Sequence, residues 1–296
     1  SCFSQEVLLS ILSIFIYFFD SFIRKCFVNR PIRFNFSIQP ECSVFINRKS
    51  CHRISIFMII DTHIHENRYS SDSFIDFKDA VDTAKLRGLN GICITNHENN
   101  DLRNEIGDWA LINGVLVIVG AEVLTHEGDI LVFGLRDIPK EKVSAEYLLE
   151  KVKKANGVAM AAHPFRTNNR GLGNNIRKLA PLLSAVESFN GSTLAHHNLM
   201  TYSLAAEYNL ASIGSSDAHV IEKIGTYSTK FYDVIRDEKD FIEAIKSGNF
   251  HPVMRKDGEF KNLDYNYHMN IREKTDSISS KYGESEVVYE RTFGSI

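Results

Sequence analysis

The chain has 296 residues and a formal net charge of −3, and its charged residues are unevenly distributed along the sequence. Residues 1–57 hold seven Lys/Arg against three Asp/Glu, so the remainder holds 27 basic and 34 acidic residues. This length allows one large domain or two small ones with an ample core. An acidic body argues against tight nonspecific binding to nucleic acid, which needs a basic surface. It fits an enzyme that acts on a small molecule and takes its positive charge from metals.

The first 57 residues differ in composition from the rest. They contain no Gly, Ala or Met but ten of the twenty Phe, and Met58 is the first methionine. We interpret residues 1–57 as an extension outside the fold, translated upstream sequence with the functional start at Met58. The alternative is a membrane anchor at residues 7–23, which are apolar apart from Asp20 and some serines and about long enough to cross a bilayer.

Cysteine usage favours a reducing compartment. Four of the five cysteines lie in residues 1–57, and only Cys93 lies beyond them, within an apolar run. The body therefore shows no disulfide framework. Even if residues 7–23 span a membrane, Arg24 and Lys25 behind them would keep the body cytoplasmic. We therefore expect a cytoplasmic protein without nucleic acid as a partner, and without a membrane as a partner unless residues 7–23 are an anchor.

Apolar runs alternate with amphipathic stretches from Met58 onward. Strands are predicted at 58–63, 91–96, 116–123, 129–134, 157–162, 185–190, 211–215 and, more weakly, 226–232. Helices are predicted at 74–87, 145–155, 174–183, 197–208 and 238–247. This alternation predicts an α/β fold with a mostly parallel sheet, and ligands at many strand ends favour a closed barrel. Residues 58–255 form the predicted domain, and the polar residues 256–296 a loosely ordered tail.

Residues that bind divalent metals follow the predicted strands. His63 and His65 are one residue apart on a strand, so both side chains project from the same face. Asp61 shares that face, either as a ligand or as an acceptor that orients His63. A histidine after a strand can simply cap the next helix, but five strands that each end in a ligand-type residue indicate a metal site. The other candidates are Asp72, His97, Glu122, His163, Asp217 and His219.

These motifs resemble the PHP superfamily (polymerase and histidinol phosphatase domains). The similar segments are Asp61-Thr-His-Ile-His65, Ser71-Asp72, Asn96-His97, Gly120-Ala-Glu122, Ala162-His163-Pro164 and Gly214-Ser-Ser-Asp-Ala-His219. The resemblance covers residues 58–255 and implies a distorted (β/α)7 barrel, a centre of two or three divalent ions and hydrolysis of phosphoesters. It also implies that Glu122 bridges two metals and that the metal positions are His63, His65, Asp72, His97, Glu122, His163, Asp217 and His219.

Three positions depart from the family pattern. Asn96 stands where the family often has Asp, which weakens the expected support of a metal. Asp129 stands where many members have a His ligand, so it could still coordinate but would favour a harder ion. Ser73 follows Asp72 where Gly is common. The first two metal sites therefore look complete, whereas a third depends on Asp129.

The residues also indicate which group attacks the substrate. The sequence contains no G-x-S-x-G elbow and no P-loop, so we expect water, activated by metal, as the nucleophile. Mixed nitrogen and oxygen ligands fit Zn²⁺, Mn²⁺ or Fe²⁺. We predict Arg166 and Asp217 as catalytic residues, with Arg166 as a phosphate clamp. Arg170 is an alternative clamp, and Asn190 either binds substrate or orders a loop.

The sequence therefore predicts a metal-dependent phosphoesterase (a hydrolase) that acts on a small phosphorylated metabolite or nucleotide. A noncatalytic metal-binding module that regulates a partner is a second hypothesis, which the nearly complete ligand set argues against. A nuclease, such as an exonuclease of the same superfamily, is a third, and the acidic body argues against it.

Overall fold

The computed structural model describes residues 57–263. The proposed extension, apart from Phe57, and the proposed tail from residue 264 onward lie outside the described residues, as does the possible anchor at residues 7–23. Within residues 57–263, each helix is too short or too polar to traverse a bilayer.

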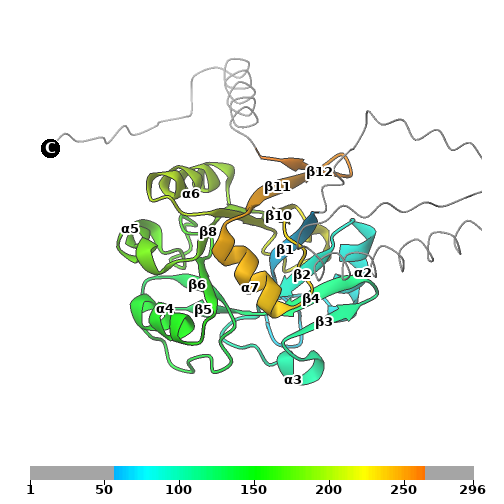
Figure 1. The fold of residues 1–296 in the computed structure, drawn as a ribbon, viewed down its shortest axis with the longest axis horizontal. Coiled ribbons are helices and arrows are strands. Elements are labelled where there is room, and N and C mark those ends of the chain that lie inside the picture. Colours follow the sequence, from blue (N-terminus) through cyan, green and yellow to red (C-terminus); the bar gives the residue numbers. More distant parts are fainter. Residues whose placement is uncertain (1–56, 264–296) are drawn as a thin grey trace, which may run out of the picture. The chain divides into compact units, whose positions relative to one another are not determined.

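The strands form two sheets (Figure 1). The seven-stranded sheet has the order β12-β11-β10-β1-β2-β4-β3, and the five-stranded sheet has the order β5-β6-β7-β8-β9. The strands are β1 (Met58–Ile64), β2 (Gly91–Ile94), β3 (Trp109–Ile112), β4 (Val115–Val119), β5 (Ala121–Leu124), β6 (Asp129–Phe133), β7 (Val158–Ala161), β8 (Ala185–Asn190), β9 (Ser212–Ser215), β10 (Tyr227–Phe231), β11 (Phe250–Lys256) and β12 (Glu259–Asn262).

Both sheets are mixed, which corrects the expectation of a mostly parallel sheet. The pairs β1–β2, β2–β4, β7–β8 and β8–β9 are parallel, and the other pairs are antiparallel. Isolated parallel bridges, Ile64 with Ala218 and His97 with Glu122, connect the two sheets. Continuous ladders do not close the described strands into one barrel, so the predicted (β/α)7 barrel is not confirmed and the fold is a mixed α/β fold.

Helices lie between the strands, and three of them begin at polar capping residues. Asp76, Ser144 and Asp237 precede α2, α4 and α7, and each accepts hydrogen bonds from backbone N–H groups of the first turn, which have no partner within the helix. The helices are α2 (Phe77–Leu86), α3 (Arg103–Ile106), α4 (Ala145–Lys154), α5 (Ile176–Leu179), α6 (Ala195–Glu207) and α7 (Glu238–Ser247).

One predicted helix is not continuous. Residues 174–183 form α5 flanked by two short 3₁₀ turns, Gly173–Asn175 and Ala180–Leu182. Pro181 lies in the second turn, where its ring and missing N–H prevent an α-helix from continuing. The other predicted helices match α2, α4, α6 and α7 to within a few residues, while α3 was not predicted.

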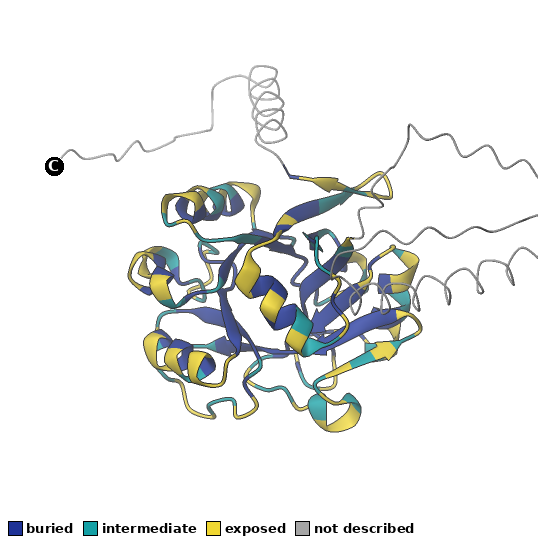
Figure 2. Ribbon diagram, in the orientation of Figure 1, coloured by how far each residue is buried: buried dark blue, intermediate teal, exposed yellow. Residues whose placement is uncertain are grey.

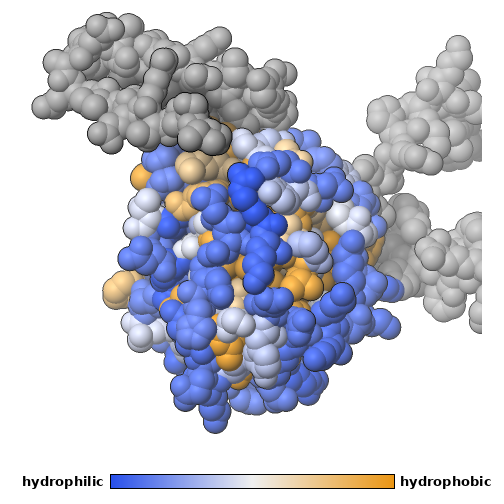
Figure 3. All heavy atoms as spheres, turned by 90° about the vertical axis from the view of Figure 1, so that its left-hand side faces the viewer, coloured by the Kyte–Doolittle hydropathy of each residue, from blue (hydrophilic) through white to orange (hydrophobic). Residues whose placement is uncertain are grey.

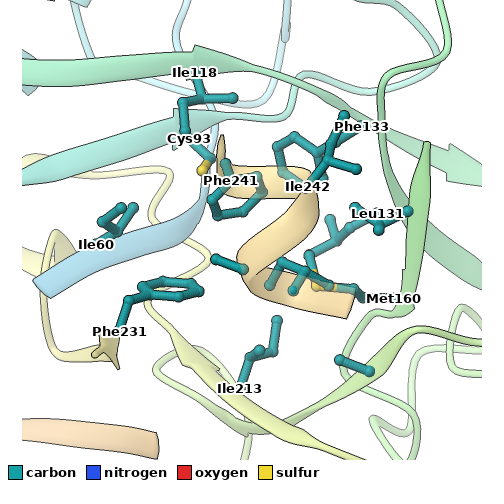
Figure 4. Close-up of a cluster of buried hydrophobic side chains, with 14 of the residues drawn as sticks. Ile60, Cys93, Ile118, Leu131, Phe133, Met160, Ile213, Phe231, Phe241 and Ile242 are labelled. Carbon is teal, nitrogen blue, oxygen red and sulfur yellow. The ribbon is translucent and has the colours of Figure 1, made fainter. Parts of the chain in front are cut away.

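Helix α7 packs into the space between the two sheets (Figure 4). Phe241, Ile242 and Ile245 contact a buried apolar cluster built from Ile60, Cys93, Ile118, Leu131, Phe133, Met160, Ile213 and Phe231. Ile60 precedes His63 by three residues, and Met160 precedes His163 by three. The apolar interior therefore lies below the strand ends that carry the predicted site.

The outer helices are amphipathic. Their inward sides are buried and their outward sides exposed, whereas the central strands are buried throughout (Figure 2). The face formed by α4, α5 and α6 is mostly hydrophilic, with apolar residues visible between the polar ones (Figure 3). This pattern is expected when helices cover a sheet with their apolar stripe.

The strands that sequence reasoning missed are β3, β11 and β12. β3 pairs with β4, while β11 and β12 extend the sheet beyond β10. Residues 256–262 therefore belong to this sheet or its last turn rather than to the tail to which we assigned them. The predicted strand 116–123 is divided at Gly120 into β4 and β5, which lie in different sheets.

Candidate metal centre

The predicted metal residues come together where the ends of strands from both sheets meet. His63 lies in β1, Glu122 in β5, and His163 and Asp217 follow β7 and β9 by two residues. Backbone hydrogen bonds fix these ends: Asp217 N–H donates to the carbonyl of His63 at 2.9 Å. The N–H of His65 donates to the carbonyl of Ala218 at 3.0 Å. The site therefore depends on contact between the two sheets.

Glu122 is the central carboxylate. Its Oε1 lies 2.8 Å from Nε2 of His163 and 3.5 Å from Nε2 of His63. Its Oε2 lies 2.9 Å from Nδ1 of His97 and 3.5 Å from Nε2 of His65. The two oxygens thus face different histidines, as a carboxylate that bridges two ions would.

Asp217 approaches the same histidines from the segment after β9, at the other edge of the five-stranded sheet from β5. Its Oδ1 lies 3.4 Å from Nε2 of His63 and 3.4 Å from Nε2 of His65. Those two ring nitrogens are 2.9 Å apart. Glu122, Asp217, His63, His65 and His163 are all buried, so they form the deep part of the centre.

Asp72, His97 and His219 form its outer part. Oδ2 of Asp72 lies 3.0 Å from Nε2 of His97 and 3.3 Å from Nε2 of His219. The Asp72 side chain is 53% exposed, so a ligand can approach from this side. Within each of three groups, the ligand atoms lie within 4.8 Å of one another: His65–His97–His219, His63–His65–Glu122 and Glu122–Asp129–His163.

Two of the candidate ligands have a left-handed backbone. The φ angles are 26° for His163 and 50° for Asp217. Residues other than glycine adopt this region at a cost of about 1–3 kcal/mol and do so most often at functional sites. The conformation turns the chain directly after β7 and β9, and the side chains of His163 and Asp217 face Glu122 and His63, respectively.

The donor set fits divalent cations. Glu122, Glu187, Asp217 and Asp129 are buried carboxylates, and clustered carboxylates need cations to offset their charge. Oδ1 of Asp217 is buried without a hydrogen-bond partner among the described residues. Nδ1 of His63 faces the carboxylate of Glu187, so a neutral ring presents the Nε2 lone pair to the cluster. An ion held by His63, His65, Glu122 and Asp217 would satisfy these atoms together.

Electrostatics within the cluster shows the same need for positive charge. Burial opposes ionisation of Glu122 and Asp217, but the neighbouring histidines hold the pKa of each well below its usual range. Burial opposes protonation of His97, yet Glu122 and Asp72 raise its pKa to about 9. Burial lowers the pKa of His65 to about 4. Without bound ions, protons on some of the histidines offset the carboxylates.

Glu187 is a site residue that sequence reasoning missed. Its Oε1 lies 3.0 Å from Nδ1 of His63 and accepts a hydrogen bond from Ser215 Oγ. Its Oε2 accepts from the backbone N–H of His163 at 2.6 Å. A glutamate in the middle of the buried strand β8 was the signal, because a charged residue is buried only with partners.

Asp61 contacts the backbone of His63 and not its ring: Oδ1 accepts a hydrogen bond from the His63 N–H at 3.5 Å. The Asp61 carboxylate accepts hydrogen bonds from the backbone N–H groups of Ser216, at 2.9 Å, and Gly225, at 2.7 Å. It therefore ties β1 to the segment that carries Asp217, and Glu187 takes the position next to the His63 ring.

Asn96 acts on the metal centre through a neighbour. Its Oδ1 accepts from Ser70 Oγ at 3.1 Å, and its Nδ2 donates to Glu66 at 2.9 Å. Ser70 Oγ in turn lies 3.3 Å from Nδ1 of His65. An amide suits this position because it must both accept and donate. Ser73, another departure from the family pattern, donates to the carbonyl of His65 at 2.8 Å.

Arg166 reaches the deep part of the centre. Its Nη2 donates to Oδ2 of Asp217 at 2.5 Å and to Oδ1 of Asn190 at 2.8 Å, and its Nε donates to Thr193 at 3.0 Å. Asn190 is fully buried, and its Nδ2 donates to Glu187 and Asp217. Asn190 thus links Arg166 to the carboxylates, which fits the ordering role among the two predicted for it.

Arg170 pairs with Asp129 at the other end of the centre. Its Nε and Nη2 donate to the two oxygens of Asp129 at 2.7 and 3.1 Å. Asp129 is buried, and its Oδ2 is 3.7 Å from Nε2 of His163. Burial and the negative charge of Glu122 raise the pKa of Asp129 to about 6.

Comparisons with known proteins support a family assignment. A family model described as PHP-associated matches residues 195–250. An uncharacterized protein of Methanocaldococcus jannaschii is 35% identical over 145 residues, which are 45% of this chain and 82% of that protein.

Solved structures show the same fold at low identity. PsfC from Pseudomonas syringae aligns with a TM-score of 0.55 and 19% identity over 75% of this chain and 99% of PsfC. A two-domain protein from Bacteroides vulgatus, containing a predicted PHP-like metal-dependent phosphoesterase, aligns with a TM-score of 0.52 and 18% identity over 68% of this chain and 65% of that protein. The lesion-specific endonuclease EndoQ from Pyrococcus furiosus aligns with a TM-score of 0.52 and 20% identity over 65% of this chain and 56% of EndoQ. From its sequence relatives, its fold and its clustered histidines and carboxylates, the chain belongs to the PHP superfamily.

Proposed function

We propose that this chain is a metal-dependent phosphoesterase that uses water to hydrolyse a small phosphorylated metabolite or nucleotide. The observation that supports this most is the convergence of His63, His65, Glu122, His163 and Asp217 on a buried cluster that opens at Asp72 and His219. Divalent ions bound there would supply Lewis acidity, which lowers the pKa of water and offsets charge on the phosphoryl oxygens.

The surrounding residues hold these ligands in place. Glu187 accepts a hydrogen bond from Nδ1–H of His63, which fixes the ring and its tautomer. Arg166 is 19% exposed, and its Nη1 has no partner among the described residues. We propose that this guanidinium contacts a phosphoryl oxygen while Asp217 and Asn190 hold it in position.

A substrate panel tests the proposal. Protein stripped with a chelator is reloaded separately with Mn²⁺, Zn²⁺ or Fe²⁺ and assayed for phosphate release from nucleoside monophosphates, sugar phosphates and histidinol phosphate. We expect turnover of at least one monoester that a chelator abolishes and the metal restores. Full activity in the chelator-treated protein would contradict the proposal.

A nuclease is the second candidate because the fold is similar to that of EndoQ, a lesion-specific endonuclease. Labelled single-stranded and lesion-containing oligonucleotides in the same assay separate the two functions. Cleavage of oligonucleotides without monoester hydrolysis would favour the nuclease. No turnover on any substrate with any metal would favour the noncatalytic regulatory module.

A further inference from the structure

We propose that Arg170 takes the place of a third cation in this chain, so that the centre binds two divalent ions. The inference rests on the metal dependence proposed above. It concerns the ligand group Glu122–Asp129–His163, which lies at the opposite side of Glu122 from His65 and His97.

The guanidinium of Arg170 uses both oxygens of Asp129. The contacts are 2.7 Å from Nε to Oδ2 and 3.1 Å from Nη2 to Oδ1, which is the paired geometry of a guanidinium and a carboxylate. Nη2 also lies 3.4 Å from Nδ1 of His97. A fixed positive charge therefore sits between Asp129 and His97, where it would repel a divalent ion bound to Asp129.

The backbone holds Arg170 in this position independently of its side chain. The N–H of Asp129 donates to the carbonyl of Arg170 at 2.6 Å, so the two residues are joined through both main chain and side chains. Asn168 accepts a hydrogen bond from the N–H of Arg170 at 3.1 Å. The contact is thus part of the fold and not a chance orientation of a long side chain.

Two glycines allow the loop to come this close. A Cβ on Gly128 would lie 2.8 Å from the carbonyl oxygen of Arg170, and a Cβ on Gly171 would lie 2.2 Å from the carbonyl oxygen of Pro164. Real Cβ atoms do not approach so closely, so only glycine fits at either position. The segment from Pro164 to Gly171 therefore packs against the start of β6, and this packing places Arg170 beside Asp129.

The remaining ligand groups keep their atoms available. His65 occurs in two of the remaining groups, His63–His65–Glu122 and His65–His97–His219, and its Nε2 can bind only one ion. With His65 assigned to the first group, Asp72, which lies beside His97 and His219, completes the second. Neither includes Asp129, and Arg166, the other arginine of the centre, contacts Asp217 through Oδ2 only. Oδ1 of Asp217 stays without a hydrogen-bond partner among the described residues, so it remains free to bind an ion with His63 and His65.

The number of ions per chain tests the inference directly. Chelator-stripped protein is loaded with excess Mn²⁺, desalted, and analysed by native mass spectrometry and by elemental analysis. We expect two ions in the wild type and three in Arg170→Met, which removes the charge but keeps an unbranched side chain. The double variant Asp129→Asn/Arg170→Met should return to two, because the carboxylate is gone. Arg177→Met, at an exposed pair with Glu207, is the matched control and should hold two.

Any count other than two in the wild type overturns the inference, and so does a count of two in folded Arg170→Met. A wild-type count of three would contradict this inference alone. A count of zero would also contradict the metal dependence on which it rests. Should Arg170→Met fail to fold by circular dichroism, the wild-type count decides the question.

Discussion

Glu187 Oε1 lies 3.0 Å from Nδ1 of His63, while Oε2 of the same carboxylate accepts the backbone N–H of His163 at 2.6 Å. The buried Glu187 side chain therefore fixes two parts of the centre. One is the His63 ring, and the other is the turn that carries His163, a second candidate ligand. Neither contact involves the surface, so solvent cannot replace them when the carboxylate is changed.

Glu187→Gln should therefore weaken metal binding. The amide can still accept from one donor, but its NH₂ group faces either the His163 N–H or the His63 ring, and one donor loses its partner. Changes to a residue that orients a metal-binding histidine typically reduce metal affinity about 10- to 100-fold. Competition with a chromogenic chelator measures this loss. Glu207→Gln, on the exposed surface, is the control, and equal affinities of the two variants would contradict the role of Glu187.

Removal of the ions should make stability depend on pH between 6.5 and 9. The pKa of His97 rises from 6.5 to about 9 because Glu122 and Asp72 outweigh the effect of burial. A histidine with a raised pKa in the folded state contributes stability in full below 6.5, and this contribution is lost as the pH rises through 9. The Tm of the chelator-treated protein should fall over this interval.

The His97→Gln variant isolates this contribution. Without the imidazole, the fall in Tm of the chelator-treated protein between pH 6.5 and 9 should be smaller than in the wild type. The Mn²⁺-loaded wild type should also show a smaller fall, because the ion replaces the proton. An equal slope for His97→Gln and wild type in the chelator would count against this assignment.

Gly171→Ala should disturb the loop that carries Arg170. The added Cβ would lie 2.2 Å from the carbonyl oxygen of Pro164 and 2.9 Å from that of His163, so the backbone must shift. Overpacking of this kind costs about 1–3 kcal/mol, and we expect weaker metal binding as well. Gly114→Ala is the control for backbone strain without overpacking, because nothing lies within 4 Å of its Cβ and its positive φ alone costs about 1–2 kcal/mol. Urea unfolding that shows no greater loss for Gly171→Ala than for Gly114→Ala would show that the loop is not tightly packed.

Arg166→Ala should lower kcat/KM on phosphoesters by about 100-fold or more if the guanidinium contacts the transferred group. Arg166→Lys should recover only part of this loss, because an ammonium cannot hold Asp217, Asn190 and substrate in the same planar arrangement. Initial rates over a range of substrate concentrations separate kcat from KM. Wild-type kinetics in Arg166→Ala would remove this residue from the reaction.

The order of apolar runs predicted most of the strands, but it did not predict the hairpins β3–β4 and β11–β12. β3 and β4 are joined by Asn113-Gly114, and β11 and β12 by Asp257-Gly258, with positive φ at all four residues. Asn-Gly and Asp-Gly are the typical two-residue hairpin turns, so the signal was present. β12 reads Glu-Phe-Lys-Asn and is not an apolar run. β3 reads Trp-Ala-Leu-Ile, an apolar run of only four residues, so its turn was the signal that would have identified it as a strand.

Most of the candidate ligands were predictable because they end or follow an apolar strand (Asp72, in a polar loop, is an exception), whereas their partners were not. The pairing of Arg170 with Asp129 joins residues 41 positions apart, and the contact of Asp61 with Gly225 joins residues 164 apart. Contacts of this kind depend on how β6 and the segment after β9 are placed, which spacing alone does not determine. The antiparallel β5–β6 hairpin likewise follows from a turn at residues 125–128, not from the α/β alternation.

Phe241→Ala should destabilise the fold by about 3–5 kcal/mol, the range for removing a buried aromatic side chain. Phe241 is fully buried on α7. The centroid of its ring lies 4.9 Å from that of Phe133 and 5.7 Å from that of Phe231, so it packs against residues from both sheets. Because the metal centre depends on the two sheets meeting, the variant should also bind Mn²⁺ less tightly.

Phe74→Ala is the matched control, since Phe74 is 82% exposed and its loss should change the free energy of unfolding by about 0.5 kcal/mol or less. Urea unfolding of both variants, with and without Mn²⁺, measures the two effects. Equal stabilities would mean that α7 does not hold the sheets together.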